Sequence, residues 1–368
     1  MVAVSTAYSA NTYYSVAASQ TANAKTAGTA SPAASTATDA AATSVTLSDA
    51  AKAALAAKDF ATVLAEARAK LNALLTEAGR TNPLEKDKLA LDLSSLDARE
   101  LYAMASDDSF TSDEQKAAGL EMQRRLEAAL AGPAAVAKVT GNYQGLYKAA
   151  AEYLDSLGAE EKAATDWIAA RAAVTEGLKQ LQTDPKKLPD AGEDDPVAIY
   201  LALVKAGETT TPRPITDVAT SARSTLDALY ADATAAGKAP TFNKNTTVGT
   251  YIDLSKFDSR TLSSIVLDTS GKFTPEETRA ADQALRAKSG AALVAGFQNA
   301  AKSSDPTAFS QNIISIYSAM SPEERQAAGW SEDFYKAALG SYQSTSQLVK
   351  MFADAGGTST SFLGLLGQ

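Results

Sequence analysis

Three stretches of the sequence recur about 160 positions further on, in the same order. They are LALDLSSLDAREL (89–101) with TYIDLSKFDSRTL (250–262), FTSDEQKAA (110–118) with FTPEETRAA (273–281), and LGAEEKAATDW (157–167) with MSPEERQAAGW (320–330). The only two tryptophans of the chain, Trp167 and Trp330, occupy matching positions. Chance does not readily place several motifs in one order at nearly one spacing. The sequence therefore predicts a duplicated unit of about 160 residues.

This duplication sets the expected domain boundaries. Residues 46–182 would form one helical repeat and residues 196–354 the other, joined by a polar, proline-rich linker at 183–195. Two copies are too few for a solenoid, so we expect two similar helical lobes. The match weakens near the start of each copy, where 207–214 and 238–249 are extra in the second copy.

The spacing of apolar residues predicts an all-α fold. Apolar side chains recur at helical intervals between clear start and stop signals, whereas alternating strand patterns are nearly absent. We expect helices at about 48–57, 60–78, 97–106, 112–131, 143–156, 160–182, 196–206, 216–236, 258–268, 275–301, 306–319, 322–328 and 331–354.

The two ends of the chain differ in composition from its middle. Residues 1–45 are mostly Ala, Ser and Thr, with Lys25 and Asp39 as the only charged residues. So few apolar groups cannot offset the entropy of ordering, so we expect this tail to be disordered. Residues 355–368 are a Gly/Ser/Thr-rich linker followed by an apolar plug, which either folds back onto the helices or serves as a docking or export peptide. The plug consists of Phe362, Leu363, Leu365 and Leu366.

Composition excludes many kinds of site. The chain has no cysteine and no histidine, which rules out disulfides, thiolate zinc sites and every catalytic triad that contains histidine. A net charge of -9 without a basic run argues against nucleic acid as a partner. No stretch approaches the roughly 18 apolar residues of a membrane span, and a Sec-type signal is not evident. With no nucleophile elbow or phosphate-binding loop either, we expect the protein not to be an enzyme.

The stretch DTSGKFTPEE at 268–277 resembles part of an EF-hand calcium loop. With Glu277 as the last ligand, at the twelfth position of the loop, a glycine falls on the sixth position, and oxygen-bearing groups fall on the third, fifth, seventh and ninth. The first position falls on Val266, whose side chain has no oxygen. The candidate calcium ligands are Asp268, Ser270, Lys272, Thr274 and Glu277.

A second interpretation of the same residues is a helix start. Thr274 would be the N-cap, Pro275 would stand in the first turn, and Glu277 would reach back from the third helical position, which is a capping box. Such a cap contributes about 1 kcal/mol to stability and requires no cofactor. The same pattern recurs in Thr111 with Glu114 and in Ser321 with Glu324.

Two Asp–Arg pairs and the two tryptophans are further candidates for functional residues. In each pair, Asp97 with Arg99 and Asp258 with Arg260, a spacing of two residues points the side chains to different sides of a helix. We expect each aspartate to cap a helix and each arginine to form a surface or interlobe ion pair. The tryptophans are expected to anchor the cores of the two lobes.

The uncharged, hydroxyl-rich N-terminal tail resembles that of bacterial substrates of the flagellar type III exporter. This resemblance implies a non-enzymatic, exported or cell-surface helical protein with an assembly or interaction role at a filament, hook or envelope component; otherwise the protein is expected in the cytoplasm. Its protein partner would bind the interlobe surface or the C-terminal plug. The alternatives are a calcium-responsive regulator that uses residues 268–277, and a protein that binds a small ligand between the lobes.

Overall fold

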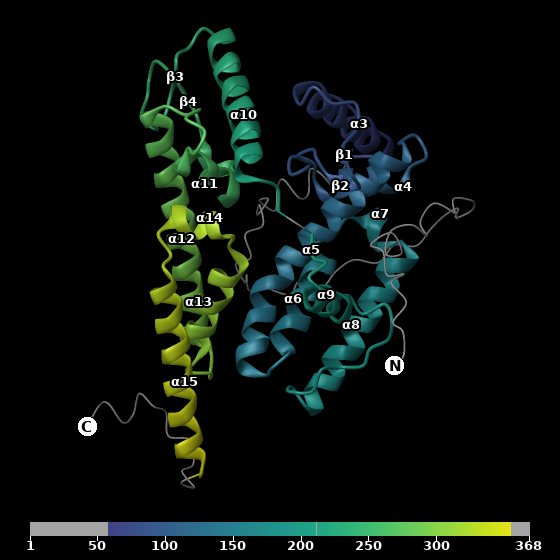
Figure 1. Ribbon diagram of the computed structural model, residues 1–368, viewed down its shortest axis with the longest axis vertical. Helices are drawn as coiled ribbons and strands as arrows, with labels where there is room; N and C mark the ends of the chain where they lie inside the picture. Colours follow the sequence, from purple (N-terminus) through teal and green to yellow (C-terminus); the bar gives the residue numbers. More distant parts are fainter. Residues whose placement is uncertain (1–57, 211, 355–368) are drawn as a thin grey trace.

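The computed structural model describes residues 58–210 and 212–354 (Figure 1). Within these residues the protein is all-α, as the apolar spacing predicts, and its strands are only two residues long. The N-terminal tail, the helix expected at 48–57 and the C-terminal plug lie outside the described residues. Among the helices that are described, none is both long and apolar enough to cross a membrane.

The elements form two halves that lie side by side (Figure 1). In chain order, the first half consists of α3 (Phe60–Glu77), β1 (Leu84–Glu85), β2 (Lys88–Leu89), α4 (Ala98–Ser106), α5 (Ser112–Thr140), α6 (Gln144–Asp155), α7 (Ala159–Lys162), α8 (Thr165–Thr183) and α9 (Pro196–Ala206). The second half consists of α10 (Ile215–Ala235), β3 (Pro240–Thr241), β4 (Thr250–Tyr251), the 3-10 helix η2 (Leu254–Lys256), α11 (Ser259–Leu267), α12 (Pro275–Lys302), α13 (Ala308–Ala319), α14 (Pro322–Ala328) and α15 (Glu332–Asp354). Strands β1 and β2 pair antiparallel, and β3 and β4 pair parallel.

A long helix in each half, α5 or α12, connects two hydrophobic cores. Core 1 joins the beginning of α5 to α3 and α4, and core 2 joins its end to α6, α8 and α9. Core 3 joins the beginning of α12 to α10 and α11, and core 4 joins its end to α13 and α15. Their most buried side chains include Leu71, Leu101 and Met104 in core 1, Leu130, Leu146 and Tyr147 in core 2, Leu226, Leu262 and Ile265 in core 3, and Ile314 in core 4.

Side-chain caps explain why the helices begin where the sequence predicts. A capping box starts each of four helices, because a side chain at the N-cap and a glutamate three residues later satisfy each other's backbone amides. The boxes are Asp97 with Glu100 in α4, Thr111 with Glu114 in α5, Thr274 with Glu277 in α12, and Ser321 with Glu324 in α14. The capping interpretation of 274–277 is therefore confirmed.

Two predicted helix boundaries are wrong. Helix α5 continues to Thr140 through Pro133 and ends at Gly141, which has φ 70°, whereas we expected it to end at 131. The helix expected at 160–182 is instead α7 and α8, because Ala164 between them has an extended backbone.

The segment 183–195 is held against the first half rather than spanning the two halves. The side chain of Gln180 exchanges two hydrogen bonds with the backbone of Asp190, at 2.9 and 3.0 Å. Asp195 then caps α9, whose side chains complete core 2. Helix α9 thus packs with the first half, although the sequence boundary at 196 places it in the second repeat. The halves are joined by residues 207–214, of which 211 is not described.

Candidate functional site

The loop between α11 and α12 contains the predicted calcium ligands. Asp268 ends α11 in the left-handed conformation, with φ 37°, and Gly271 follows with φ 62°. The Asp268 carboxylate accepts a hydrogen bond from the backbone amide of Lys272 at 2.7 Å, which closes the loop on itself. The Lys272 ammonium donates to the Thr220 hydroxyl on α10 at 2.9 Å.

Glu277, the last predicted calcium ligand, is buried and engaged on both oxygens. One oxygen accepts hydrogen bonds from the Arg223 guanidinium at 2.8 Å and the Tyr230 hydroxyl at 2.7 Å, and the other accepts from the Thr274 amide at 2.7 Å. Burial alone would raise the pKa of this carboxyl, but the hydrogen bonds from Thr274, Tyr230 and Arg223 outweigh it and hold the pKa below its usual value.

The structure brings only part of the predicted ligand set together. Thr274 and Glu277 meet in the capping box, while the Asp268 carboxylate is turned to the amide of Lys272. Within residues 58–210 and 212–354, no group of three or more acidic side chains is arranged to hold a metal ion. Calcium binding stays a prediction, and the oxygens of Glu277 that it needs already have partners.

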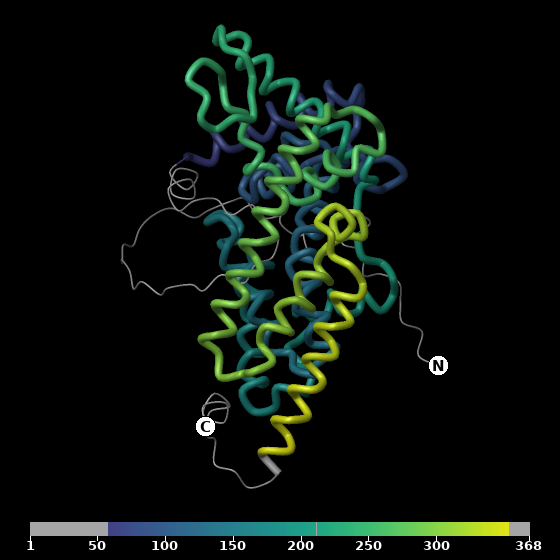
Figure 2. The backbone as a smooth tube through the Cα atoms, turned by 90° about the vertical axis from the view of Figure 1, so that its left-hand side faces the viewer, coloured from purple at the N-terminus to yellow at the C-terminus, as the bar shows by residue number. Residues whose placement is uncertain are grey.

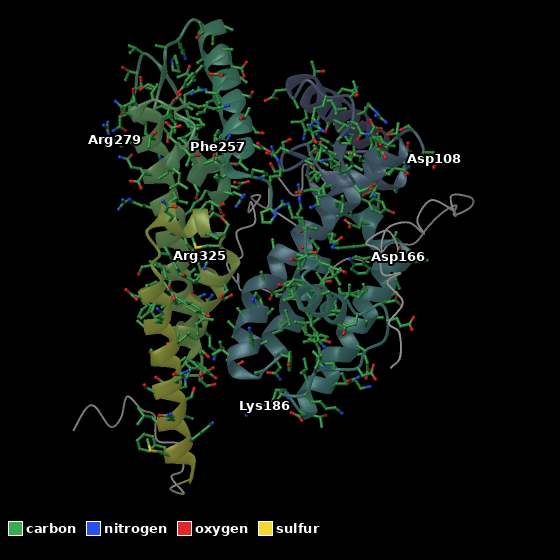
Figure 3. The ribbon with its side chains drawn as sticks, in the orientation of Figure 1. Asp108, Asp166, Lys186, Phe257, Arg279 and Arg325 are labelled. Atoms are coloured by element: carbon green, nitrogen blue, oxygen red, sulfur yellow. The ribbon has the colours of Figure 1, made fainter. Side chains whose placement is uncertain are left out.

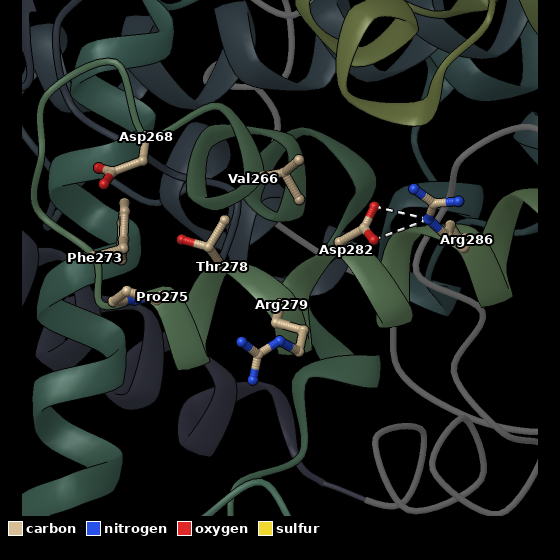
Figure 4. Close-up of a pocket in the computed structure, with 8 residues that line it drawn as sticks. All are labelled: Val266, Asp268, Phe273, Pro275, Thr278, Arg279, Asp282 and Arg286. Atoms are coloured by element: carbon tan, nitrogen blue, oxygen red, sulfur yellow. Dashed lines mark hydrogen bonds and ion pairs between the residues drawn. The ribbon is translucent and has the colours of Figure 1, made fainter.

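A shallow depression lies beside this loop (Figure 4). Its lining includes an ion pair between Asp282 and Arg286, 2.9 Å apart, in which both charges satisfy each other. Arg279 projects from the outer side of the second half, away from the first half (Figure 3). The depression is lined by Val266, Asp268, Phe273, Pro275, Thr278, Arg279, Asp282 and Arg286, and so it does not lie between the two halves.

A matching contact in the first half indicates that the buried glutamate is structural. Arg68 on α3 pairs with Glu114 at 2.9 Å and stacks on the ring of Phe110, 3.8 Å from its centroid. This contact ties α3 to α5, as Arg223 and Glu277 tie α10 to α12. The sequence match of ARAKL with ARSTL aligns the two arginines but shows nothing of their partners.

The Asp–Arg pairs have structural roles. Asp97 and Asp258 accept hydrogen bonds from the backbone amides three residues later, at 2.9 and 2.6 Å, so both cap helices as expected. Arg99 pairs with Glu160 on α7, and Arg260 lies 3.7 Å from Glu323 on α14. The first of these ion pairs lies within the first half, and the other lies within the second half.

The ion pair that reaches from the connection to the first half is one that sequence reasoning missed. Arg213, in the connection 207–214, pairs with Asp92. Burial would raise the pKa of the Asp92 carboxyl, but Arg213 and the Ser94 amide outweigh this effect and lower it. No sequence signal links the two residues, because Arg213 lies in a segment without a counterpart in the first copy.

The tryptophans pack in the cores, as expected. Trp330 is 9% exposed in core 4 and meets Phe334 edge to face at a centroid distance of 5.2 Å. Trp167 is partly buried against core 2, and its indole N–H donates to the Leu154 carbonyl at 2.9 Å. Neither ring lines the depression at the α11–α12 loop.

The contact between the halves is close. A Cβ built on Gly132 of α5 would lie 2.5 Å from the Ser315 hydroxyl and 2.6 Å from its carbonyl oxygen, so the two helices nearly touch there. Val136 and Val139, also on α5, pack against core 4. Binding of a small ligand between the lobes stays a prediction, and the close approach at Gly132 leaves no room for one at that point.

The second half carries an exposed apolar surface on the last turns of α15. Four side chains there, which we call the α15 face, are 40–58% exposed: Leu348, Val349, Met351 and Phe352. Helix α15 continues past the ends of its neighbours (Figure 2), so these turns have no helix beside them among the described residues. Sequence reasoning predicted this helix but missed its exposure. The available signal of a contact surface was the lack of charge, since Lys350 is the only charged residue between 337 and 352, but this lack does not distinguish an exposed face from a buried one.

A second apolar surface lies on α12. Val294 is 56% exposed and Phe297 is 61% exposed, and we call these two residues the α12 patch. The ring of Phe297 meets Phe309 of α13 edge to face, 5.7 Å between centroids.

Comparison of the chain with protein-family models, curated proteins and solved structures found no match. A function must therefore be inferred from the surfaces of the protein itself. The α15 face and the α12 patch are the strongest candidates, because large apolar side chains that remain in water mark contact sites on folded proteins.

Proposed function

We propose that this is a non-enzymatic helical protein that acts by binding another protein, in an assembly outside the cell or at its surface. The α15 face carries this proposal. Burying apolar surface stabilises a contact by roughly 25 cal/mol per Å², and the cores of protein interfaces are poor in charge and rich in aromatic residues and methionine. The α15 face has both properties.

The spacing of these residues suggests the chemistry of the partner. Leu348, Met351 and Phe352 stand at i, i+3 and i+4, so they share one side of the helix. A helix that presents such a stripe fits an apolar groove or the apolar stripe of another helix. Methionine adapts its shape to irregular surfaces. The partner we propose is therefore a helical protein with an uncharged apolar contact surface.

Photo-crosslinking tests the proposal directly. A photoreactive amino acid in place of Phe352 is expected to give a discrete protein adduct in the producing cells. The same amino acid in place of Lys350 is the matched control, because a residue two positions away points to another side of α15.

Replacing Leu348 and Met351 together by Asp should reduce the adduct at least tenfold and leave the free energy of unfolding within about 0.5 kcal/mol, since both side chains are exposed. Equal labelling from positions 350 and 352, or labelling unaffected by the double substitution, contradicts a specific interface on the α15 face.

A further inference from the structure

We infer that residues 360–366, in the C-terminal plug, form a short helix that docks on the α12 patch, in the place that α9 takes in the first half. This inference concerns a different surface from the α15 face and does not depend on the proposed function. It decides between the two interpretations of the plug in favour of folding back onto the helices.

Helix α9 shows how such a helix closes a core. After α8 the chain turns back, Asp195 caps α9, and Val197, Tyr200 and Leu201 pack on core 2. The start of α9 is fixed at Asp195, which is fully buried and accepts a hydrogen bond from the Tyr147 hydroxyl of α6. Core 2 is therefore enclosed by four helices: the end of α5, α6, α8 and α9.

Core 4 is built from the corresponding helices, and Val136 and Val139 of α5 pack against it. Among the described residues, no short helix of the second half covers it as α9 covers core 2. Phe297 on α12 stands 163 positions after Ala134, which is partly buried against core 2, yet Phe297 is 61% exposed. Phe309 on α13 stands 163 positions after Leu146, which is fully buried, and is itself only partly buried. The second half is thus open and apolar at positions that are covered in the first half.

The plug has the residue pattern of α9. Phe362, Leu365 and Leu366 repeat the i, i+3, i+4 spacing of the three α9 side chains that pack on core 2. Thr360 stands two residues before Phe362, as Asp195 stands two residues before Val197, and threonine is a favoured N-cap.

The chain after α15 has room for a linker and a short helix in the register of α9. Tyr335, Ala338, Leu339 and Tyr342 of α15 have the same spacing as the buried Ala170, Ala173, Val174 and Gly177 of α8, at an offset of 165. In this register Leu348 matches Thr183, the last residue of α8. Helix α15 continues for six residues beyond Leu348, which is about 9 Å. Residues 355–359 can span up to about 17 Å when extended. They include Gly356 and Gly357, which permit a sharp reversal.

A helix of about seven residues is not stable alone in water, so this one depends on its contact with α12. The plug offers a phenylalanine and two leucines on one side, and the α12 patch offers Val294 and Phe297 beside Phe309. The connection by a few residues gives the chain's own plug a far higher effective concentration at this surface than a second copy would have.

The absence of cysteine from the chain permits a sharp test in the full-length protein. Val294→Cys with Leu365→Cys, treated at low protein concentration with a short bismaleimide, is expected to give a crosslinked monomer. Val248→Cys with Leu365→Cys is the control: Val248 is 85% exposed in the loop before β4, so a thiol there should add the maleimide but form no crosslink to position 365. A crosslinked dimer would show docking between copies, and no product would show no docking; either result overturns the inference.

Hydrogen exchange gives a second measurement. Replacing Phe362, Leu365 and Leu366 together by Ser is expected to speed exchange at least tenfold in residues 291–302 and leave residues 112–124 unchanged. Leu363→Ser is the matched control, since this side chain lies about 100° away from Phe362 around a helix and should have no effect. Unchanged exchange in the triple variant, or an equal effect of Leu363→Ser, contradicts docking by the i, i+3, i+4 face.

Discussion

At the residue scale, one buried glutamate lacks the partner that its counterpart has. Glu324 of α14 shares a capping box with Ser321, whereas the N-cap of the matching helix α7 is Gly158, which has no hydroxyl. A Cβ at Gly158 would lie 2.5 Å from Cγ of Arg99, so the glycine makes room for the arginine. Glu161 is therefore left 4% exposed with one carboxylate oxygen unpartnered.

This environment makes the stability of the protein depend on pH. Burial raises the pKa of Glu161 to about 8, against smaller opposing effects of Lys162 and Arg125. The folded chain therefore holds the proton more tightly than the unfolded chain. The buried neutral carboxyl contributes its full stability at pH values below the ordinary pKa of 4.5. This contribution is lost as the pH rises towards 8, because the carboxyl must then either lose its proton in a buried site or keep it at a cost in free energy.

Glu161→Gln should remove this dependence, because the amide stays neutral at every pH. The free energy of unfolding of the native chain is expected to fall relative to that of the variant between pH 5 and pH 8, by at most about 1.4 kcal/mol per pH unit. Urea unfolding at pH 5, 6.5 and 8 measures the difference. A constant gap between the two proteins across this range would show that Glu161 does not titrate there.

At the element scale, α5 contributes to both cores of its own half and to core 4 of the other. The sequence analysis places its end at about 131, and proline inside a helix costs about 3 kcal/mol. The helix nevertheless continues, since Ala137 packs in core 2 while Val136 and Val139 pack against core 4. Those contacts come from side chains far along the chain, and no local pattern near Pro133 reveals them.

At Gly132 the helices α5 and α13 approach closely, and substitution of this glycine tests the contact between the halves. Gly132→Ala is expected to lower the free energy of unfolding by about 1–3 kcal/mol, because a Cβ there meets the Ser315 backbone. Gly290→Ala, the same change in the other long helix, has nothing within 4 Å and should raise stability by up to about 1 kcal/mol. Urea unfolding measures the free energy of unfolding of both variants. Equal changes of the same sign would show that α5 and α13 are not closely packed at Gly132.

At the scale of the whole molecule, local signals predicted the helices well and their arrangement poorly. Caps at Asp97, Thr111 and Thr274 are readable because each depends on residues three positions apart. The position of α9 cannot be predicted in this way, because a short apolar helix could pack on either half. It packs on the first half, where the Tyr147 hydroxyl donates a buried hydrogen bond to the Asp195 carboxylate.

The candidate surfaces were harder to predict than the fold. Exposure of the α15 face depends on where neighbouring helices stop, which no stretch of α15 itself records. The two halves show the same order of helices, α3 to α8 and α10 to α15, and ion pairs at matching places. Their origin by duplication stays a prediction.

The export hypothesis concerns the whole chain, because it assigns the tail and the helices separate tasks. Deleting residues 2–40 should abolish appearance of the protein outside the producing cells and leave the melting temperature of the helical part within about 1 °C, because the composition of this tail predicts that it adds nothing to the hydrophobic cores. Undiminished secretion of the shortened protein would remove the export idea.

The sharing of α5 among three cores imposes an order on biosynthesis. The ribosome delivers α5 long before α13, and domains fold as units from the N-terminus during translation. By the time Ile313 and Ile316 leave the ribosome, we expect the first half to be folded, with Val136 and Val139 of α5 exposed on its surface. We expect the first half to provide the surface on which the last helices assemble, and a nascent chain without it to leave the apolar side of α13 in water.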